Sequence, residues 1–177
     1  MTRVTCALML PVLMSLSVSI AAVEQVASAA AEVLIVRNLE DQRFWKSHPQ
    51  EGKLKAPVYP RDLLRAGVSG CVAIGFYIEP DGSTSNYRVL DSKIGDAISR
   101  KVGNKDRRAI TSMFGNAAVK YLAGIRFEPG ADNSGRKRGF AAMPIAFSAD
   151  ASPLKGSCNI PDLEVFLSNK IAQAPSA

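Results

Sequence analysis

Few side chains of this sequence could carry chemistry, and the cysteine thiols come first among them. The chain holds three cysteines and one histidine. It has no CxxC motif and no histidine near Cys71 or Cys158, so the residue pattern of a zinc site is missing. These two cysteines can form one disulfide with each other, and two free thiols are the alternative. We therefore expect no metal site and no cofactor, and a Cys71–Cys158 disulfide is the one pairing that the sequence offers.

Candidate catalytic groups are equally sparse. His48 is the single histidine and stands beside Pro49, with no catalytic partner nearby in the sequence. The sequence also lacks a nucleophile motif, a paired-carboxylate signature and a glycine loop that could hold a phosphate. We therefore do not expect an enzyme. A cleft that holds Asp62, Asp81 or Glu128 with a strongly raised pKa would reopen that question.

The first 29 residues are expected to form a secretory signal peptide. Arg3 precedes an uncharged apolar run over residues 4–23, and residues 27–29 form an A-x-A cleavage pattern. The alternative is an uncleaved membrane anchor, because an apolar run of about twenty residues is long enough to cross a bilayer. Cleavage would remove Cys6 and leave the other two cysteines in an oxidising compartment. We expect an exported protein that associates with a membrane only if this segment stays uncleaved.

The charge balance is basic without a nucleic-acid signature. The formal net charge is +6, and basic residues gather in the stretches 100–108 and 136–138, which look like loops or helix ends. Export and the lack of aromatic residues within these clusters argue against nucleic-acid binding. Solvated surface charge is the simplest interpretation. Attraction to acidic lipid or polysaccharide head groups is left open.

The clearest structural pattern lies over residues 56–82. Pro60 has the backbone angle that suits the first turn of a helix, and a short helix is expected after it. Residues 71–78 alternate, with Val72, Ile74, Phe76 and Ile78 on one face and Ala73, Gly75 and Tyr77 on the other, which predicts a half-buried strand. The run Pro-Asp-Gly at residues 80–82 predicts a tight turn, because glycine reaches positive φ without strain.

Two further strands are expected downstream. Residues 84–90 should pair back as a hairpin partner, with Tyr87 and Val89 on the inner face. Residues 138–148 alternate again and predict a third strand. Pro144 places this third strand at the edge of the sheet, because a residue without an N–H is tolerated there and hardly ever in the middle.

A long helix is expected over residues 107–125. Its apolar residues recur at helical spacing and form one stripe, which indicates packing against the sheet. The order helix, strand, turn, strand, long helix, strand predicts an α+β fold. This fold is a small two-layer sandwich, in which helices cover a three-stranded antiparallel sheet. The stripe consists of Ile110, Met113, Phe114, Ala117, Ala118, Tyr121, Leu122 and Ile125.

The predicted segments of the chain follow from these elements. The lead-in contains a short apolar run that could add a strand, and Phe44 and Trp45 are expected to pin it to the domain surface. The C-terminal tail holds Cys158 and an expected short helix over residues 161–170. The four segments are a signal peptide at 1–29, a lead-in at 30–55, a folded domain at 56–149 and a tail at 150–177.

The domain resembles the C-terminal domain of TonB-type energy transducers. The likeness covers residues 56–149, and its motifs stand in the family's order. Ile125 stands where the family has Trp, residues 91–106 contain an insertion, and no long Pro-rich spacer precedes the domain. The motifs are PVYP from residue 57, AGVSG from residue 66, V-x-I-x-F-x-I from residue 72, DG from residue 81, AAV from residue 117 and IRFEPG from residue 125.

The resemblance implies a periplasmic domain that takes part in TonB-dependent transport. Its partner would be an extended peptide of an outer-membrane transporter or another envelope protein, bound by strand addition at the third strand's edge. A homodimer is left open. The residues expected to touch the partner are Pro57, Val58, Tyr59, Pro60, Gly139, Phe140, Ala142 and Ala146.

A second interpretation is a non-catalytic structural or scaffold module of the cell envelope. Pro144 removes one hydrogen-bond donor from the edge and would protect it from pairing. The disulfide and the tail would then fix a compact monomer. A tail packed along the third strand would favour this interpretation.

Overall fold

The computed structural model describes residues 33–37, 39–48, 56–95, 98, 103–149 and 158–172. The chain divides into the units Met1–Ala30 and Ala31–Ala177, and all described residues belong to the second. The signal peptide predicted at residues 1–29 lies outside the described residues, and its cleavage stays a prediction.

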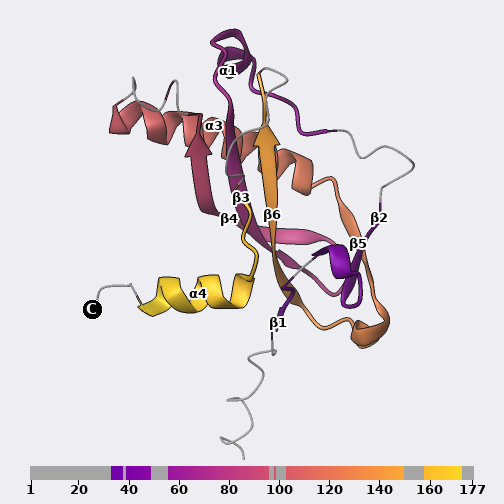
Figure 1. Ribbon diagram of the computed structural model, residues 1–177. Helices are drawn as coiled ribbons and strands as arrows, with labels where there is room; N and C mark the ends of the chain where they lie inside the picture. Colours follow the sequence, from indigo (N-terminus) through magenta and orange to yellow (C-terminus); the bar gives the residue numbers. More distant parts are fainter. Residues whose placement is uncertain are drawn as a thin grey trace, which may run out of the picture. The chain divides into compact units, whose positions relative to one another are not determined.

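The main sheet has four strands in the order β1-β6-β3-β4 (Figure 1). The predicted three-stranded antiparallel sheet forms its core, because β3 pairs antiparallel with both β4 and β6. The lead-in adds a fourth strand, which pairs parallel with the start of β6. The strands are β1 (Leu34–Ile35), β3 (Gly70–Ile78), β4 (Thr84–Ile94) and β6 (Gly139–Phe147).

A second, two-stranded sheet joins the lead-in to the end of the long helix. β2 (Trp45–His48) pairs antiparallel with β5 (Arg126–Pro129). Trp45 is only 1% exposed and belongs to the main core. Trp45 therefore holds the lead-in to the domain, as expected, and β2 carries its indole into the core.

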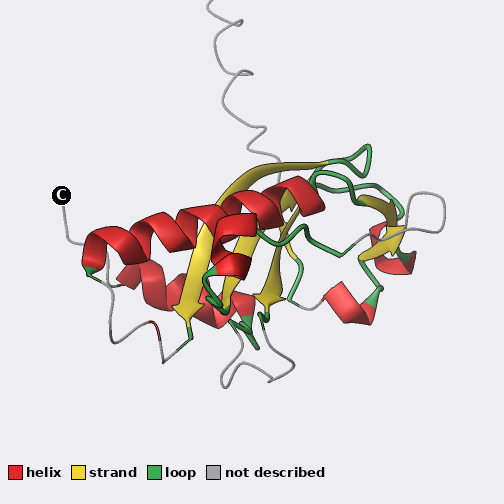
Figure 2. Ribbon diagram, turned by 90° about the horizontal axis from the view of Figure 1, so that it is seen from above, coloured by secondary structure: helices red, strands yellow, loops and turns green. Residues whose placement is uncertain are grey.

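Three α-helices and two short 3-10 helices complete the described structure. The long helix α3 runs across the strands of the main sheet (Figures 1 and 2). Residues that the sequence placed in its apolar stripe, including Ile110, Phe114 and Ala118, are buried. The helices are α1 (Arg61–Arg65), α3 (Asn104–Leu122), α4 (Leu163–Ala172), η1 (Leu39–Asp41) and η3 (Ala131–Asn133).

The core between α3 and the sheet is apolar and dense. Val72, Ile74 and Phe76 of β3 have no exposed surface. Phe114 of α3 stacks on Phe147 of β6, with 4.8 Å between the ring centroids. Burial of a large apolar side chain of this kind stabilises a fold by about 2 kcal/mol, so this layer contact holds the two-layer sandwich together.

β3 is buried on both faces, which corrects the prediction of a half-buried strand. Its second face carries Cys71 and Ala73, which are 2% and 0% exposed. Cys158 of the tail packs against them, and Leu90 and Ile160 adjoin this small cluster. The periodicity of one strand cannot show that a segment 87 residues away in the sequence packs on its second face.

The hairpin partner β4 departs from the predicted pattern in its middle. Val89 lies on the inner face, as expected, because it pairs with the core residue Ile74, but it is 46% exposed. The register between β3 and β4 shifts twice, and Asn86 has a positive φ of 51°. A bulge of this kind turns side chains away from strict alternation. Val89 still lies toward α3, because a Cβ on Gly115 would come within 3.2 Å of its Cγ2.

Candidate functional site: the edge of β6 and the segment beside it

Among the described residues, the outer edge of β6 is paired only at its start. β1 pairs with Gly139 and Phe140, and the last hydrogen bond of this pairing runs from the Val36 N–H to the Phe140 carbonyl, 2.8 Å apart. The Arg138 carbonyl accepts the preceding bond, from Leu34. The N–H and C=O groups of alternate residues point to opposite sides of a strand. The main-chain N–H and C=O groups of the even-numbered residues of β6 therefore point away from β3.

The open part of this edge begins at Ala142. Ala142, Pro144 and Ala146 present their main-chain groups on the side where β1 has ended. Pro144 lies opposite Ala73 in the pairing with β3, and its missing N–H falls on the outer side, so the inner ladder loses no donor. The edge position predicted from Pro144 is therefore correct for this half of the strand.

Gly139 and Phe140 do not lie on an open edge, which corrects the sequence expectation for these two residues. Both are buried, because the apolar run of β1 pairs with them. Phe140 also packs its ring against Tyr77, with 5.1 Å between centroids. The sequence could not show that a two-residue strand from the lead-in would take this position.

The segment from Pro57 to Pro60 lies at the opposite end of β6 from Gly139. The Tyr59 ring meets the Phe147 ring edge-on, with centroids 5.5 Å apart. Phe147 is eight residues from Gly139, which corresponds to about 26 Å along a strand. The structure therefore brings Tyr59 near the open half of the edge and separates it from the two residues that β1 covers.

Tyr59 is fixed in place by its hydroxyl and its ring. The hydroxyl donates a hydrogen bond of 2.7 Å to the Val68 carbonyl. The ring also meets Phe114 edge-on at 6.0 Å. Val58, in contrast, is 81% exposed. Tyr59 thus anchors the segment to the core while its neighbour faces solvent.

A groove of about 620 Å³ lies between this segment and α3. Its lining is mainly apolar, and all four predicted contact residues from Pro57 to Pro60 contribute to it. The sequence placed several helical residues of this groove in the core stripe. They lie at the border of that stripe and are only partly buried, which single-helix periodicity cannot distinguish from core. The stripe residues at the groove are Met113, Ala117 and Tyr121, and the exposed Asn116 and Lys120 of α3 line it as well.

Comparison with known protein families concerns this same region. Residues 55–102 match the family model described as Gram-negative bacterial TonB protein C-terminal. This segment of the chain is therefore similar to the TonB C-terminal family. It comprises the Pro57–Pro60 run, α1, β3 and β4, so the resemblance read from the PVYP and DG motifs is confirmed. Comparison with the curated proteins finds no match.

Solved TonB C-terminal domains resemble the chain as well. The domain from Pseudomonas aeruginosa, solved by solution NMR, is 21% identical, with 69% of this chain and 99% of that chain covered and a TM-score of 0.43. A Helicobacter pylori TonB C-terminal domain is 20% identical, with 54% and 72% covered and a TM-score of 0.34. The α+β class predicted for the TonB-like domain agrees with the fold described above.

The far edge of the sheet, along β4, is less suited to pairing. β4 has two register shifts against β3. Arg88, Asp91 and Lys93 are exposed along it. Bulges and charges are the usual devices that keep an edge strand from pairing with another chain. In the TonB-like domain, the open half of β6 is therefore the better candidate for strand addition.

The predicted disulfide between Cys71 and Cys158 is present. Both cysteines are 2% exposed. The bond joins the start of β3 to the tail and closes a loop across 87 positions of sequence. It brings the tail, which the family match does not include, onto the second face of the sheet.

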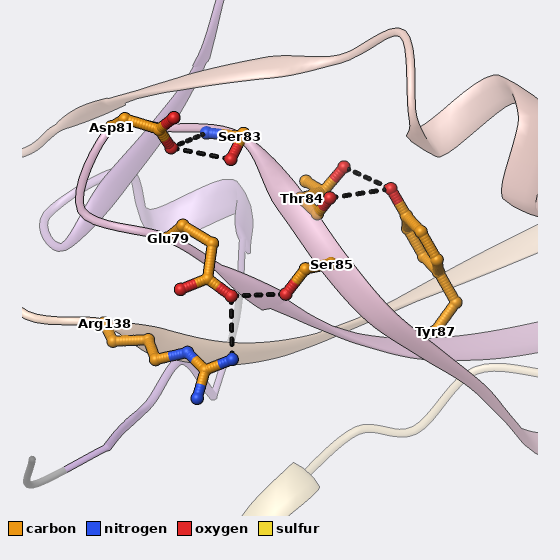
Figure 3. A network of polar contacts seen from close by, with 7 residues as sticks. All are labelled: Glu79, Asp81, Ser83, Thr84, Ser85, Tyr87 and Arg138. Carbon is orange, nitrogen blue, oxygen red and sulfur yellow. Dashed lines mark hydrogen bonds and ion pairs between the residues drawn. The ribbon is translucent and has the colours of Figure 1, made fainter.

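A polar network fixes the turn of the β3–β4 hairpin against the start of β6 (Figure 3). Glu79 accepts a hydrogen bond of 2.7 Å from Arg138 and another from Ser85. The bond from Arg138 is the main cause that lowers the pKa of Glu79. The Arg138 guanidinium also lies 4.0 Å from the Tyr77 ring centroid. These contacts make the covered end of β6 a rigid corner.

Asp81 stabilises the turn of the same hairpin. It accepts hydrogen bonds from the Ser83 hydroxyl and the Ser83 N–H, 2.6 Å and 2.8 Å long, and these bonds lower the pKa of its carboxyl group. A lowered pKa is the opposite of what would have reopened a catalytic role for this residue. Among the described residues, no group of three or more His, Cys, Asp or Glu side chains is placed to hold a metal ion.

The helices of the described part of the chain are too short or too polar to cross a membrane. The longest of them, α3, has 19 residues. None of the described helices is both long and apolar enough to span a bilayer.

Proposed function

We propose that this domain binds extended peptide segments of outer-membrane transporters, or of other envelope proteins, by strand addition in the periplasm. The bound segment would pair with β6 beyond Phe140, and the domain would take part in TonB-dependent transport. The observation that carries this proposal is the end of the β1 ladder at Phe140, which leaves the outer main-chain groups of Ala142 and Ala146 facing away from β3. Unpaired edge groups of this kind bind extended partners through main-chain hydrogen bonds.

Pro144 removes one donor from the open edge and leaves its carbonyl oxygen as an acceptor. The N–H groups of Ala142 and Ala146 can each donate to a partner strand, whereas Pro144 has no N–H to donate. The Pro57–Pro60 segment lies beside the Phe147 end of this edge, through the contact of Tyr59 with Phe147. A peptide that runs along β6 would reach this segment, so its exposed Val58 offers further contact area.

An NMR titration tests the proposal. A peptide from the periplasm-facing plug of an outer-membrane transporter should broaden or shift the amide signals of Ala142 and Ala146. The signals of Gly139 and Phe140, which β1 covers, should change much less. If the Ala142 and Ala146 signals stay unchanged at saturating peptide, strand addition at this edge is refuted.

A structural module of the envelope is the second candidate, because the tail reaches the same edge. Residues 158–161 and residues 142–144 line one cavity together, and the disulfide fixes the tail there. Under this alternative the tail occupies the edge permanently. The Ala142 and Ala146 amides would then exchange as slowly as those bonded to β3, with or without peptide.

A further inference from the structure

A cavity of about 480 Å³ lies where the open part of the β6 edge begins. Ala142, Met143 and Pro144 form its floor. The lead-in around Leu39 forms one wall, and the tail around Ile160 forms the other. Cavities of this size are typical of sites that hold a small molecule or part of one.

The walls of this cavity come from outside the segment that matches the TonB family. The matched residues are 55–102, whereas the walls belong to η1 and to residues 158–161. The disulfide fixes the tail wall to β3. An ion pair between Arg37 and Glu164 joins the lead-in wall to α4, although both side chains are exposed and such a pair contributes little by itself.

The cavity lies beside the first open main-chain groups of β6, those of Ala142. The last hydrogen bond from β1 reaches Phe140, and Ala142 is the next residue with outward main-chain groups. A strand paired there would project alternate side chains to one face. That face carries Ala73 and the Cys158 cluster, and both of these residues line the cavity.

We infer that this cavity is a specificity pocket for one large apolar side chain of the peptide that pairs with β6. The inference rests on the proposed strand addition and goes beyond it, because it predicts which peptides are preferred. The lining is mixed. Leu39, Pro144, Ile160 and Pro161 supply apolar surface for such a side chain, and Arg37, Glu40 and Asn159 supply polar surface. A leucine-sized side chain gains burial there, and an alanine leaves the cavity empty.

Binding of a defined peptide series tests the pocket. The probes are seven-residue peptides Thr-Val-Thr-X-Thr-Val-Thr with blocked ends, in which X is Leu or Ala, titrated into the full oxidised chain. The Leu peptide should bind at least about tenfold more tightly, the scale on which an apolar pocket distinguishes side chains of different size. The amide signals of Ala142 and Ala146 should shift or broaden when either peptide binds.

Filling the pocket should abolish this preference. Ala142→Leu places extra atoms in the cavity, and Ile160→Phe does so from the tail wall if the first variant fails to fold. The matched control is Ala123→Leu, which makes the same change on an exposed residue after α3, outside the cavity lining and away from the β6 edge. The control should retain the preference for Leu.

The outcomes separate the two proposals. If both peptides shift the edge amides with equal affinity, or if the preference survives Ala142→Leu and Ile160→Phe, the pocket is refuted while strand addition stands. If neither peptide shifts the edge amides at saturating concentration, the pocket and the edge pairing are refuted together.

Discussion

The Tyr59 ring meets the Phe147 ring edge-on, with 5.5 Å between their centroids. This contact joins the segment before α1 to the last residue of β6. It places the exposed Val58 beside the end of the edge that β1 leaves open. The domain therefore presents its two candidate contact surfaces next to each other, although 87 positions separate Tyr59 from Ala146 in the sequence.

Loss of the Tyr59 hydroxyl should loosen this junction. Tyr59→Phe removes the hydrogen bond to the Val68 carbonyl and should lower the free energy of unfolding by about 1 kcal/mol. Urea denaturation measures this change. Tyr121→Phe removes a hydroxyl at the same groove and serves as the matched control, with an expected change within about 0.5 kcal/mol. Equal effects of the two substitutions would show that the Val68 bond does not stabilise the segment.

Removal of the disulfide should destabilise the whole domain. The bond spans 87 positions of sequence, and the chain-entropy relation gives about 4.5 kcal/mol for a loop of this length. The double variant Cys71→Ser with Cys158→Ser should therefore melt well below the oxidised protein. A reductant should lower the melting temperature of the native sequence and leave the double variant unchanged. Two free thiols in unreduced protein, seen by mass spectrometry, would contradict the bond itself.

Two loop glycines should differ sharply in their tolerance of a side chain. Gly82 has a φ of +80°, and a Cβ there would lie 2.0 Å from the Phe127 carbonyl oxygen. Gly82→Ala should cost more than about 2 kcal/mol, because strain and a backbone clash add together. A Cβ on Gly135 would meet no atom within 4 Å, so Gly135→Ala is the near-neutral control. A stability of Gly82→Ala equal to that of the control would contradict the turn geometry.

Acid should weaken the corner formed by Glu79 and Arg138. The pKa of Glu79 is lowered from 4.5, chiefly by its bond to Arg138. A carboxyl group with a lowered folded-state pKa contributes stability above its unfolded pKa, and this contribution is lost as the pH falls through the folded pKa. Glu79→Gln should therefore lose stability at pH 7 and show a flatter decline below about pH 4.5. Urea midpoints at several pH values measure both effects.

Arg138→Gln provides the partner variant for this test. It should flatten the same part of the pH profile, and adding Glu79→Gln should change the profile little further. Additive effects of the two substitutions on the acid decline would show that the pair does not titrate as a unit.

The elements with strong local patterns could be predicted from the sequence alone. The alternation over residues 71–78 and the apolar stripe of α3 reflect one-dimensional periodicities that a single segment carries. The position of β1 and the second face of β3 depend on segments that are distant in the chain. The apolar run of the lead-in was predicted to add a strand, but its pairing with β6 could not be read from the run itself. The packing of Cys158 on Cys71 likewise depends on where the tail lies.

The candidate site was likewise predicted only where a local property of the sequence decides it. Pro144 correctly predicted an edge, because its missing N–H is a local property. The sequence could not show that β1 would cover Gly139 and Phe140 and leave Ala142 and Ala146 outside. The lining of the cavity beside Ala142 also escaped prediction, since its walls come from distant parts of the chain, Leu39 and Ile160 among them.

Amide hydrogen exchange at the edge of β6 tests the central claim most directly. Without peptide, the Ala142 and Ala146 amides should exchange faster than those of Met143 and Ile145, which face β3. A saturating transporter peptide should slow exchange at Ala142 and Ala146 and leave the other two unchanged. Unchanged exchange at Ala142 and Ala146 under saturation would contradict strand addition at this edge.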